Sequence, residues 1–442
     1  MLKTIKNALK TPEVRKKLLL TLLLIVVFRI GCFIVVPNVD SKELANQLSS
    51  STSTLAGLVN TISGGAFSRL SVFAMSITPY ITASIIIQLL AMIIPALEQL
   101  TKEGGEEGRK KVNFYTKVLC LVLAAVEATG IYISYSKSYP GIFLNPGLMT
   151  GVIFVLSMVA GTSILVWLGD QITEKGIGNG ISMLIFVGIV SRLPSGVLQI
   201  FNLAFRPFNT VNFLIALAVL IGAIILVGAV VFVQEAERKV PVQYAKKVVG
   251  RKMYGGQNTH IPMKLAMAGV MPIIFASSFM TFPAMLIQIF NPQAITGTGF
   301  WHGVYNFSIA TSTSQGIPIG FVIANAIVYL LLIIGFTYFY TFATFNPAEV
   351  ANTIKKNGGF IPGIRAGKPT SDYIGSVLSK LTFFGGFYLS IIAILPMFMR
   401  FTSLDLAFGG TSILIVVGVA LEFVQQLESQ LLVRHYKGFL DT

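Results

Sequence analysis

Long runs of apolar residues, separated by shorter polar segments, cover most of this chain. A helix needs about 20 apolar residues to cross a bilayer, and ten runs come close to that length. Because backbone groups in lipid must be hydrogen-bonded within the segment itself, such runs predict membrane-spanning helices. The sequence therefore predicts an all-α polytopic membrane protein. Its expected spans are 18–36, 75–95, 116–135, 151–169, 181–198, 213–233, 265–289, 318–344, 374–396 and 411–428.

Lysine and arginine gather on alternate loops between these runs. Four basic regions, Lys3–Lys17, Lys102–Lys117, Arg238–Lys264 and Lys355–Lys368, contrast with intervening loops that carry isolated charges. Positive residues accumulate on the cytoplasmic side of a membrane protein. Both termini are therefore expected in the cytoplasm, which requires an even number of spans.

The composition agrees with this topology. Of 442 residues, 54% are hydrophobic and 12% are charged, and the formal net charge is +15. Such an excess of positive charge suits anionic lipid headgroups or RNA phosphates. Cys32 and Cys120 lie inside apolar runs without the spacing of a disulfide framework or a metal site. The first run is too long for the apolar core of a cleavable signal peptide, so we interpret it as a span.

One apolar stretch, Leu55–Pro95, is far too long for a single span. Its first part, Asn60–Phe73, is short, interrupted by glycines, and carries Arg69. An arginine against lipid is costly, and irregular backbone at membrane depth is tolerated only inside protein or beside a wet cavity. The pattern predicts a re-entrant helix folded back into the protein. An amphipathic helix on the extracellular surface is the alternative.

Two loops on the predicted cytoplasmic side are unusually long, about 234–264 and 346–372. In the first, alternation at Val240, Val242 and Tyr244 leads to a glycine, which predicts a two-stranded hairpin. Glycines and prolines predict tight turns in the second. Basic projections of this kind suit a large anionic or acidic partner, and simple solvated loops are the alternative.

No catalytic pattern is present in the sequence. His260, His302 and His435 are far apart and lack metal-ligand spacing, and there is no phosphate-binding loop motif. We therefore expect no enzyme activity, no cofactor and no metal.

Four ionisable residues lie within predicted spans, so a solute transporter is an alternative function. They are Arg29, Glu127, Lys380 and Glu422. Coupled transporters place such groups at mid-membrane. Only Glu127 is an acid at clear depth, and an interhelical hydrogen bond explains it equally well, so its role stays open.

Several short motifs, in order along the whole chain, resemble the SecY family of bacterial protein-conducting channels. They are Phe28-Arg-Ile-Gly31, Ser63-Gly-Gly65, Pro79-Tyr-Ile-Thr-Ala-Ser-Ile-Ile-Ile-Gln88, Gly176-Ile-Gly-Asn-Gly-Ile-Ser182, Pro272-Ile-Ile-Phe-Ala-Ser-Ser278, Asn346-Pro347, Gly359-Phe-Ile-Pro-Gly-Ile-Arg365 and Gly409-Gly-Thr-Ser412. Each motif alone is weak, but their order and spacing make chance similarity very improbable.

The resemblance implies two five-helix halves, related as an inverted repeat, around an hourglass pore. The halves are residues 1–198 and 213–442, joined by a hinge loop at 199–212. It also implies that the re-entrant segment at 60–73 is a plug for the extracytoplasmic funnel. The implied plug residues are Ile62, Ser63, Gly64, Gly65, Ala66, Phe67, Ser68, Arg69 and Leu70.

A ring of six bulky apolar side chains narrows the pore in this family, and every matching position here is isoleucine. They are Ile77, Ile81, Ile181, Ile185, Ile274 and Ile415. Residues four apart share one helical face, and β-branched side chains are stiff at χ1. From the residues alone, packing or lipid contact explains such isoleucines.

The resemblance further implies a lateral gate between the second and seventh spans, also lined by the third and eighth. Thr82 and Phe282 match positions that face each other across it, and Gln88 adds a polar group. Ordinary interhelical hydrogen bonding is the alternative role for Thr82 and Gln88.

The cytoplasmic loops match the family's docking surface for the ribosome or the SecA motor. The matching residues are Arg251, Lys252, Lys355, Lys356 and Arg365, and arginine suits bidentate contact with phosphate or carboxylate. The chain departs from the family pattern at Ala366, Glu422 and Glu127.

Together these features predict the central subunit of a channel in the bacterial plasma membrane. It would pass unfolded secretory polypeptides and release hydrophobic segments sideways into lipid. Its expected partners are SecE-like and SecG-like small membrane subunits, the SecA ATPase, the ribosome, signal sequences, nascent chains and membrane lipids. A secondary transporter of a small solute is the alternative function.

Overall fold

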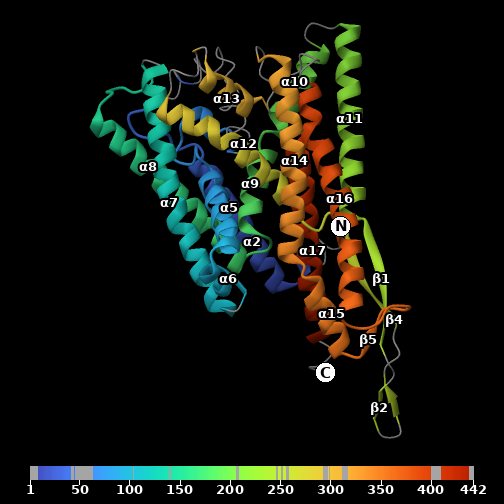
Figure 1. Ribbon diagram of the computed structural model, residues 1–442. Helices are drawn as coiled ribbons and strands as arrows, with labels where there is room; N and C mark the ends of the chain where they lie inside the picture. The colour runs from blue at the N-terminus through green and yellow to red at the C-terminus, as the bar shows by residue number, and fades with distance from the viewer. Residues whose placement is uncertain are drawn as a thin grey trace.

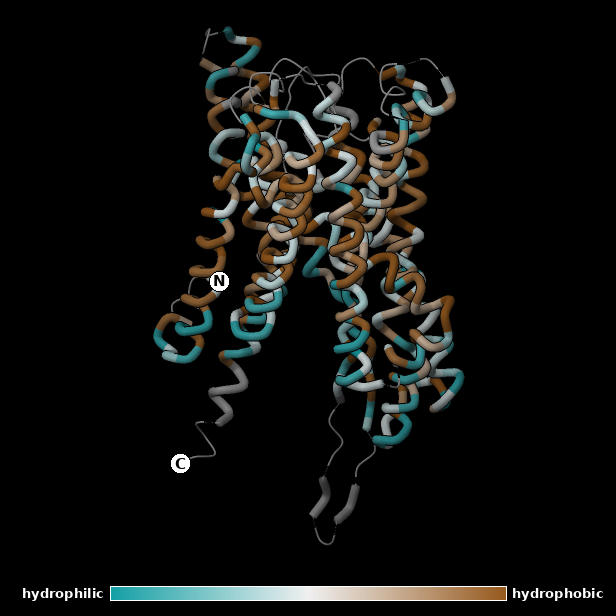
Figure 2. The backbone as a smooth tube through the Cα atoms, turned by 90° about the vertical axis from the view of Figure 1, so that its left-hand side faces the viewer, coloured by the Kyte–Doolittle hydropathy of each residue, from teal (hydrophilic) through white to brown (hydrophobic). Residues whose placement is uncertain are grey.

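The protein is a bundle of long helices with a small set of strands projecting from one end (Figure 1). The computed structural model describes residues 8–40, 44, 63–102, 104–138, 141–205, 209–244, 247–249, 252–254, 258–291, 297, 299–310, 317–399 and 410–437. Hydrophobic residues run along the helices, and hydrophilic residues gather at the lower ends, where the strands project (Figure 2).

Seven stretches within the described residues are long and apolar enough to cross a membrane. Two of these stretches contain a pair of helices each, α9 with α10 and α14 with the short helix α15 (Pro347–Lys356). The helices of all seven stretches are α7 (Gly105–Ser138), α8 (Leu148–Lys175), α9 (Gly180–Val190) with α10 (Leu193–Phe205), α11 (Thr210–Glu235), α14 (Ile319–Thr344), α16 (Lys368–Met399) and α17 (Gly410–Lys437).

The other three predicted spans are also helical. They are α2 (Pro12–Gly31), α5 (Thr78–Ile93) and α12 (Met271–Phe290). After α5 the chain turns by 108° into α6 (Pro95–Lys102). Each predicted run therefore contains a helix, while ten as the number of membrane crossings stays a prediction.

Several helix ends differ from the predicted ones, each for a local reason. The first span ends at Gly31 rather than 36, because the chain beyond it is extended and Val35 forms a bridge with Ser71. The third begins at Gly105 rather than 116, with a charged first turn. The seventh begins at Met271 rather than 265, with a proline in its first turn.

The predicted re-entrant helix at 60–73 is wrong in its secondary structure for the described part, residues 63–73. This part contains turns and one short 3-10 helix, η1 (Phe67–Arg69). Gly64, Gly65 and Leu70 have φ angles of 65°, 89° and 43°, which a right-handed helix does not accept. Ser63 and Leu70 are fully buried, so the segment lies inside the protein and not on its surface. Predicted plug residue Ile62 lies outside the described residues.

The two long basic loops meet in one antiparallel sheet. Strand β1 (Glu237–Tyr244) pairs with β4 (Asn258–Lys264) and with β5 (Gly359–Phe360), in the order β4-β1-β5. Beyond it, β2 (Lys247–Val249) pairs with β3 (Lys252–Tyr254). The predicted hairpin is confirmed, and β5 adds a link to the second loop that the sequence did not indicate.

The basic loops that carry the strands lie at one end of the bundle. Helices α6 and α15 and the strands are at the lower end in Figure 1, whereas α13 (Phe300–Ile309) is at the upper end. This arrangement agrees with the alternation of charge along the sequence. The basic loops and α13 thus lie on opposite sides of the apolar region, and the side of the membrane that each faces stays a prediction.

A close approach of glycines joins α8 to α9. A Cβ atom on Gly180 would lie 1.9 Å from the carbonyl oxygen of Gly169, and Ile181 packs against that same glycine. Any side chain at 180 would therefore push the two helices apart. On α11, by contrast, a Cβ atom on Gly222 would meet nothing within 4 Å.

We predict that Gly180→Ala destabilises the folded protein by about 1–3 kcal/mol, the usual cost of overpacking. Gly222→Ala is the matched control and should be neutral or stabilising by up to about 1 kcal/mol, because alanine is the better helix former. Thermal unfolding of both purified variants in detergent measures the difference. Equal stability of the two variants would contradict the close approach of α8 and α9.

Candidate functional site

Six isoleucines from four regions of the chain belong to one apolar cluster at the centre of the bundle. Ile77, Ile81, Ile185 and Ile415 are buried members, and Ile181 and Ile274 pack against them. They come from α5 and the residue before it, α9, α12 and α17. All six residues of the predicted ring therefore lie together.

Local capping fixes where these side chains point. Ile77 is the residue before α5, and its carbonyl oxygen accepts from the Ile81 amide at 3.0 Å, which sets the two side chains one turn apart. Asn179 precedes α9, and its side-chain oxygen accepts from the amides of Ile181 and Ser182 at 3.1 and 3.4 Å. The glycine-rich motif at 176–180 is thus a sharp turn that ends in a helix N-cap.

The predicted plug segment packs directly on the isoleucine cluster. Ala66 and Phe73 are buried members of the same cluster. Phe73 also stacks on Phe28 of α2, with ring centroids 6.1 Å apart. The isoleucines and part of the predicted plug segment therefore belong to one apolar cluster.

Internal hydrogen bonds hold the plug segment in its folded shape. The Phe67 amide donates to Ser63 Oγ at 3.2 Å, and Ser68 Oγ donates to the carbonyl oxygen of Gly65 at 3.0 Å. Arg69 is exposed, and its guanidinium lies 4.6 Å from the ring centroid of Phe33. The sequence prediction rested on the cost of placing this arginine against lipid. In the structure its side chain lies over an aromatic ring and is not buried in the protein.

The residues predicted for a lateral gate lie on α5 and α12, which pack against each other. Thr82 Oγ1 donates to the carbonyl oxygen of Thr78 at 3.1 Å, and Gln88 Nε2 donates to Ser84 Oγ at 3.0 Å. Both bonds stay within α5, so neither side chain bonds to α12. Phe282 is 38% exposed. Apolar contacts of the isoleucine cluster, including Phe275 of α12, hold this seam.

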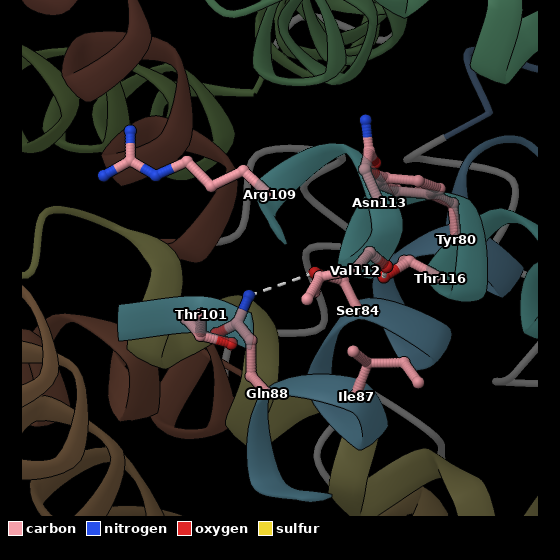
Figure 3. A pocket seen from close by; sticks show the side chains of 9 residues that line it. All are labelled: Tyr80, Ser84, Ile87, Gln88, Thr101, Arg109, Val112, Asn113 and Thr116. Atoms are coloured by element: carbon pink, nitrogen blue, oxygen red, sulfur yellow. Dashed lines mark hydrogen bonds between the residues drawn. The ribbon is translucent and has the colours of Figure 1, made fainter. Parts of the chain in front are cut away.

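A pocket of about 190 Å³ lies between α5, α6 and α7 (Figure 3). The Tyr80 hydroxyl donates to Asn113 Oδ1 at 3.4 Å across the two helices. Gln88, one of the residues that line this pocket, was assigned to a functional site from the sequence. Tyr80, Ser84 and Gln88 are four residues apart and share one face of α5, and this spacing could have indicated the pocket. The polar lining residues are Tyr80, Ser84, Gln88, Thr101, Arg109, Asn113 and Thr116.

Three of the predicted docking residues are exposed on the projection that carries the strands. Lys355 and Lys356 end α15, and Arg365 follows β5 in the same loop. Lys252 begins β3 of the outer hairpin, while Arg251 lies outside the described residues. The β1–β5 pairing ties this loop to the hairpin loop, and Val240, Ile354 and Ile361 share one buried core beneath it.

The ionisable residues inside the predicted spans do not form a common site. Arg29 donates to the Gly64 carbonyl oxygen, and Glu422 accepts from Gln426 within α17. In the described part of the chain Glu127 has no hydrogen bond, so the interhelical bond considered for it is not formed. An ion pair that the sequence did not indicate, Lys117 with Asp170 at 2.6 Å, joins α7 to α8. No group of three or more potential metal ligands occurs among the described residues.

Comparison with known proteins assigns this arrangement to one family. The SecY family profile matches residues 71–424. The protein translocase subunit SecY of Halalkalibacterium halodurans is 43% identical over 447 residues, and that of Bacillus subtilis is 43% identical over 448 residues, each alignment covering both chains completely. These names agree with the expectation that the chain is not an enzyme.

Solved structures share the fold at lower sequence identity. A protein-conducting channel has a TM-score of 0.66 at 21% identity, with 93% of this chain and 91% of that chain covered. A structure described in terms of how the SecY plug domain stabilises the closed channel has a TM-score of 0.65 at 20% identity, with the same coverage. Sec61 in the canine ribosome-channel complex gives 0.62 at 20% identity, again over 93% and 91%. With full-length relatives at 43% identity and a family profile that covers most of its residues, this chain belongs to the SecY family.

Proposed function

We propose that this chain is the central subunit of a protein-conducting channel. Unfolded secretory polypeptides cross the membrane through it, and hydrophobic segments leave it sideways into lipid. The convergence of six isoleucines on one central cluster, with the plug segment packed against them, carries the proposal. The translocase names of the full-length relatives support it.

The isoleucine cluster separates polymers from ions by solvation. An ion that enters it meets no oxygen or nitrogen ligand, and a bare charge in an apolar medium costs on the order of tens of kcal/mol by Born estimates. A polypeptide can instead displace the side chains and keep contact with them as it moves. The same ring thus seals the channel at rest and fits around a chain in transit.

The seam between α5 and α12 is the proposed lateral gate. Because Thr82 and Gln88 bond within α5, the seam depends on apolar contacts. A hydrophobic segment can replace such contacts with equivalent ones as it passes, and burial of its side chains in lipid is favourable. Phe282, partly exposed on α12, then lies along the exit path.

The cytoplasmic projection is the proposed docking surface for a force-generating partner. Lys355, Lys356 and Arg365 are exposed there, and the sheet holds both loops in one body. An acidic motor ATPase of the SecA type or ribosomal RNA suits this charge. The canine Sec61 relative was observed in a ribosome-channel complex, which supports the second partner. We further propose that the chain associates with SecE-like and SecG-like subunits. It would lie in a bacterial plasma membrane with both termini in the cytoplasm.

The alternative, a small-solute transporter, finds less support. Arg29, Glu127, Lys380 and Glu422 lie on four different helices and do not bond to one another. Coupled transport requires such groups to converge on a shared ion or proton site. The central position is instead occupied by isoleucine.

We predict that Ile415→Asn weakens the seal, because an amide in the ring offers water and ions a polar ligand. Halide flux through proteoliposomes should rise several-fold, and export of substrates with defective signal sequences should increase. Ile413→Asn is the matched control, since Ile413 lies on the same helix but packs in a different cluster. Equal flux through both variants would argue against the ring.

We predict that Arg365→Glu abolishes most motor-driven translocation, because an exposed guanidinium becomes a carboxylate facing an acidic partner. Translocation of a secretory precursor into proteoliposomes, with motor ATPase and ATP supplied, measures this loss. Arg365→Lys should retain partial activity as a point charge without the bidentate fork. Lys111→Glu, exposed on α7, controls for charge reversal elsewhere on the cytoplasmic side. Normal activity of Arg365→Glu would defeat the docking proposal.

A further inference from the structure

The last turn of α2 forms a seat for the start of the described plug segment. Arg29 Nη1 donates to the carbonyl oxygen of Gly64 at 3.3 Å. Cys32 Sγ lies 4.0 Å from the carbonyl oxygen of Ser63. Two successive plug carbonyls therefore face α2, and the stronger of the two donors is a guanidinium.

Gly64 is enclosed between α2 and α9. A Cβ atom at this position would lie 2.6 Å from Arg29 Nη1, 2.8 Å from Ser191 Oγ and 3.0 Å from the carbonyl oxygen of Gly188. Its φ angle of 65° is also unfavourable for other residues. The backbone of the plug segment thus passes through a gap that only glycine fits, and Arg29 forms one wall of that gap.

The two ends of the plug segment are held differently. At its C-terminal end, backbone hydrogen bonds join Val36 to Leu70 at 3.1 Å and Val72 to Ile34 at 2.8 Å. Near the start of its described part, the Arg29 side chain of α2 donates a hydrogen bond to the Gly64 carbonyl oxygen. A backbone bridge can act as a fixed hinge. A side-chain hydrogen bond, by contrast, can break without loss of secondary structure.

The side chain of Arg29 is suited to a reversible hydrogen bond with the plug segment. Its guanidinium has five N–H donors, and Gly64 supplies the one protein acceptor found among the described residues. It also lies 5.9 Å from the ring centroid of Phe33, whose ring is shared with Arg69 of the plug segment. A hydrogen bond to a charged donor is stronger than a neutral one but remains a single interaction.

We propose that Arg29 is a positioning residue that latches the plug segment in its closed position through the Gly64 carbonyl, while the Val35–Ser71 bridge serves as the hinge. The inference rests on the proposed channel function. Loss of the latch frees the N-terminal end of the plug segment, and Ala66 can then leave the isoleucine cluster. The chain folds normally, but its closed state leaks.

Halide flux in proteoliposomes containing the full chain with its co-purified membrane subunits tests the seal. Arg29→Met should raise the flux several-fold over the unchanged protein, and Arg29→Lys should raise it less. Arg15→Met is the matched control, because it removes an exposed arginine from the first half of the same helix without touching Gly64. If Arg29→Met does not fold, Gly64→Ala opens the same gap and should leak in its place.

Disulfide formation tests the position of the plug segment without reference to transport. The chain has two cysteines, Cys32 and Cys120, so Ser63→Cys combined with Cys120→Ala leaves one reporter pair beside Arg29. Mild oxidation should cross-link residues 32 and 63 readily when Arg29 is present. Adding Arg29→Met should slow this cross-linking several-fold, and adding Arg15→Met should not.

Unchanged flux for both Arg29→Met and Gly64→Ala would overturn the latch, and so would an unchanged cross-linking rate. Slower cross-linking with unchanged flux would also overturn it, because the tie would then not hold the barrier. Failure of the channel function itself looks different: the unchanged protein would not translocate a secretory precursor, whatever the cross-linking rate.

Discussion

The cost of removing water from an ion is the constraint on which this structure depends. Isoleucine side chains from α5, α9, α12 and α17 meet at one place, and none of them can replace a water ligand. The capping turns at Ile77 and Asn179 and the glycine contact between α8 and α9 direct those side chains inward. A hydrophobic bundle needs no such convergence for its stability, since lipid is as apolar as isoleucine.

Plug, ring and lateral seam share one set of apolar contacts. Ala66 of the plug segment, Ile81 of α5 and Phe275 of α12 all belong to the same cluster. Separation of α5 from α12 therefore removes part of the surface on which the plug segment lies. Entry of a hydrophobic segment at the gate and release of the plug are expected to be linked through packing, without a separate signalling element.

Hydropathy was sufficient to predict the helices, because a bilayer demands long apolar runs. It did not predict the N-terminal extension of α7, which is charged and carries the pair Lys110–Glu106 at i, i+4. It failed for residues 63–73, where positive φ angles at Gly64 and Leu70 replace a helix by turns. It also missed β5, since a strand of two residues has no pattern to recognise.

The candidate site was less visible in the sequence than the fold. Isoleucine at i, i+4 is ordinary in any membrane helix, so the ring could be predicted only through family resemblance. Thr82 and Gln88 were expected near a seam between helices, yet their hydrogen bonds stay within α5. The contact of Arg29 with Gly64 joins residues on opposite sides of a long loop, and no local pattern encodes it.

Cross-linking of a chain caught in transit tests the central claim most directly. A photoreactive residue placed at 81 or at 274 should label a stalled secretory polypeptide, whereas one at Ile225, 65% exposed on α11, should label lipid. Strong adducts at both inner positions and none at 225 are the predicted result. Absence of adducts at 81 and 274 while translocation proceeds would contradict the account, because the polypeptide would then take a path that avoids the isoleucine cluster.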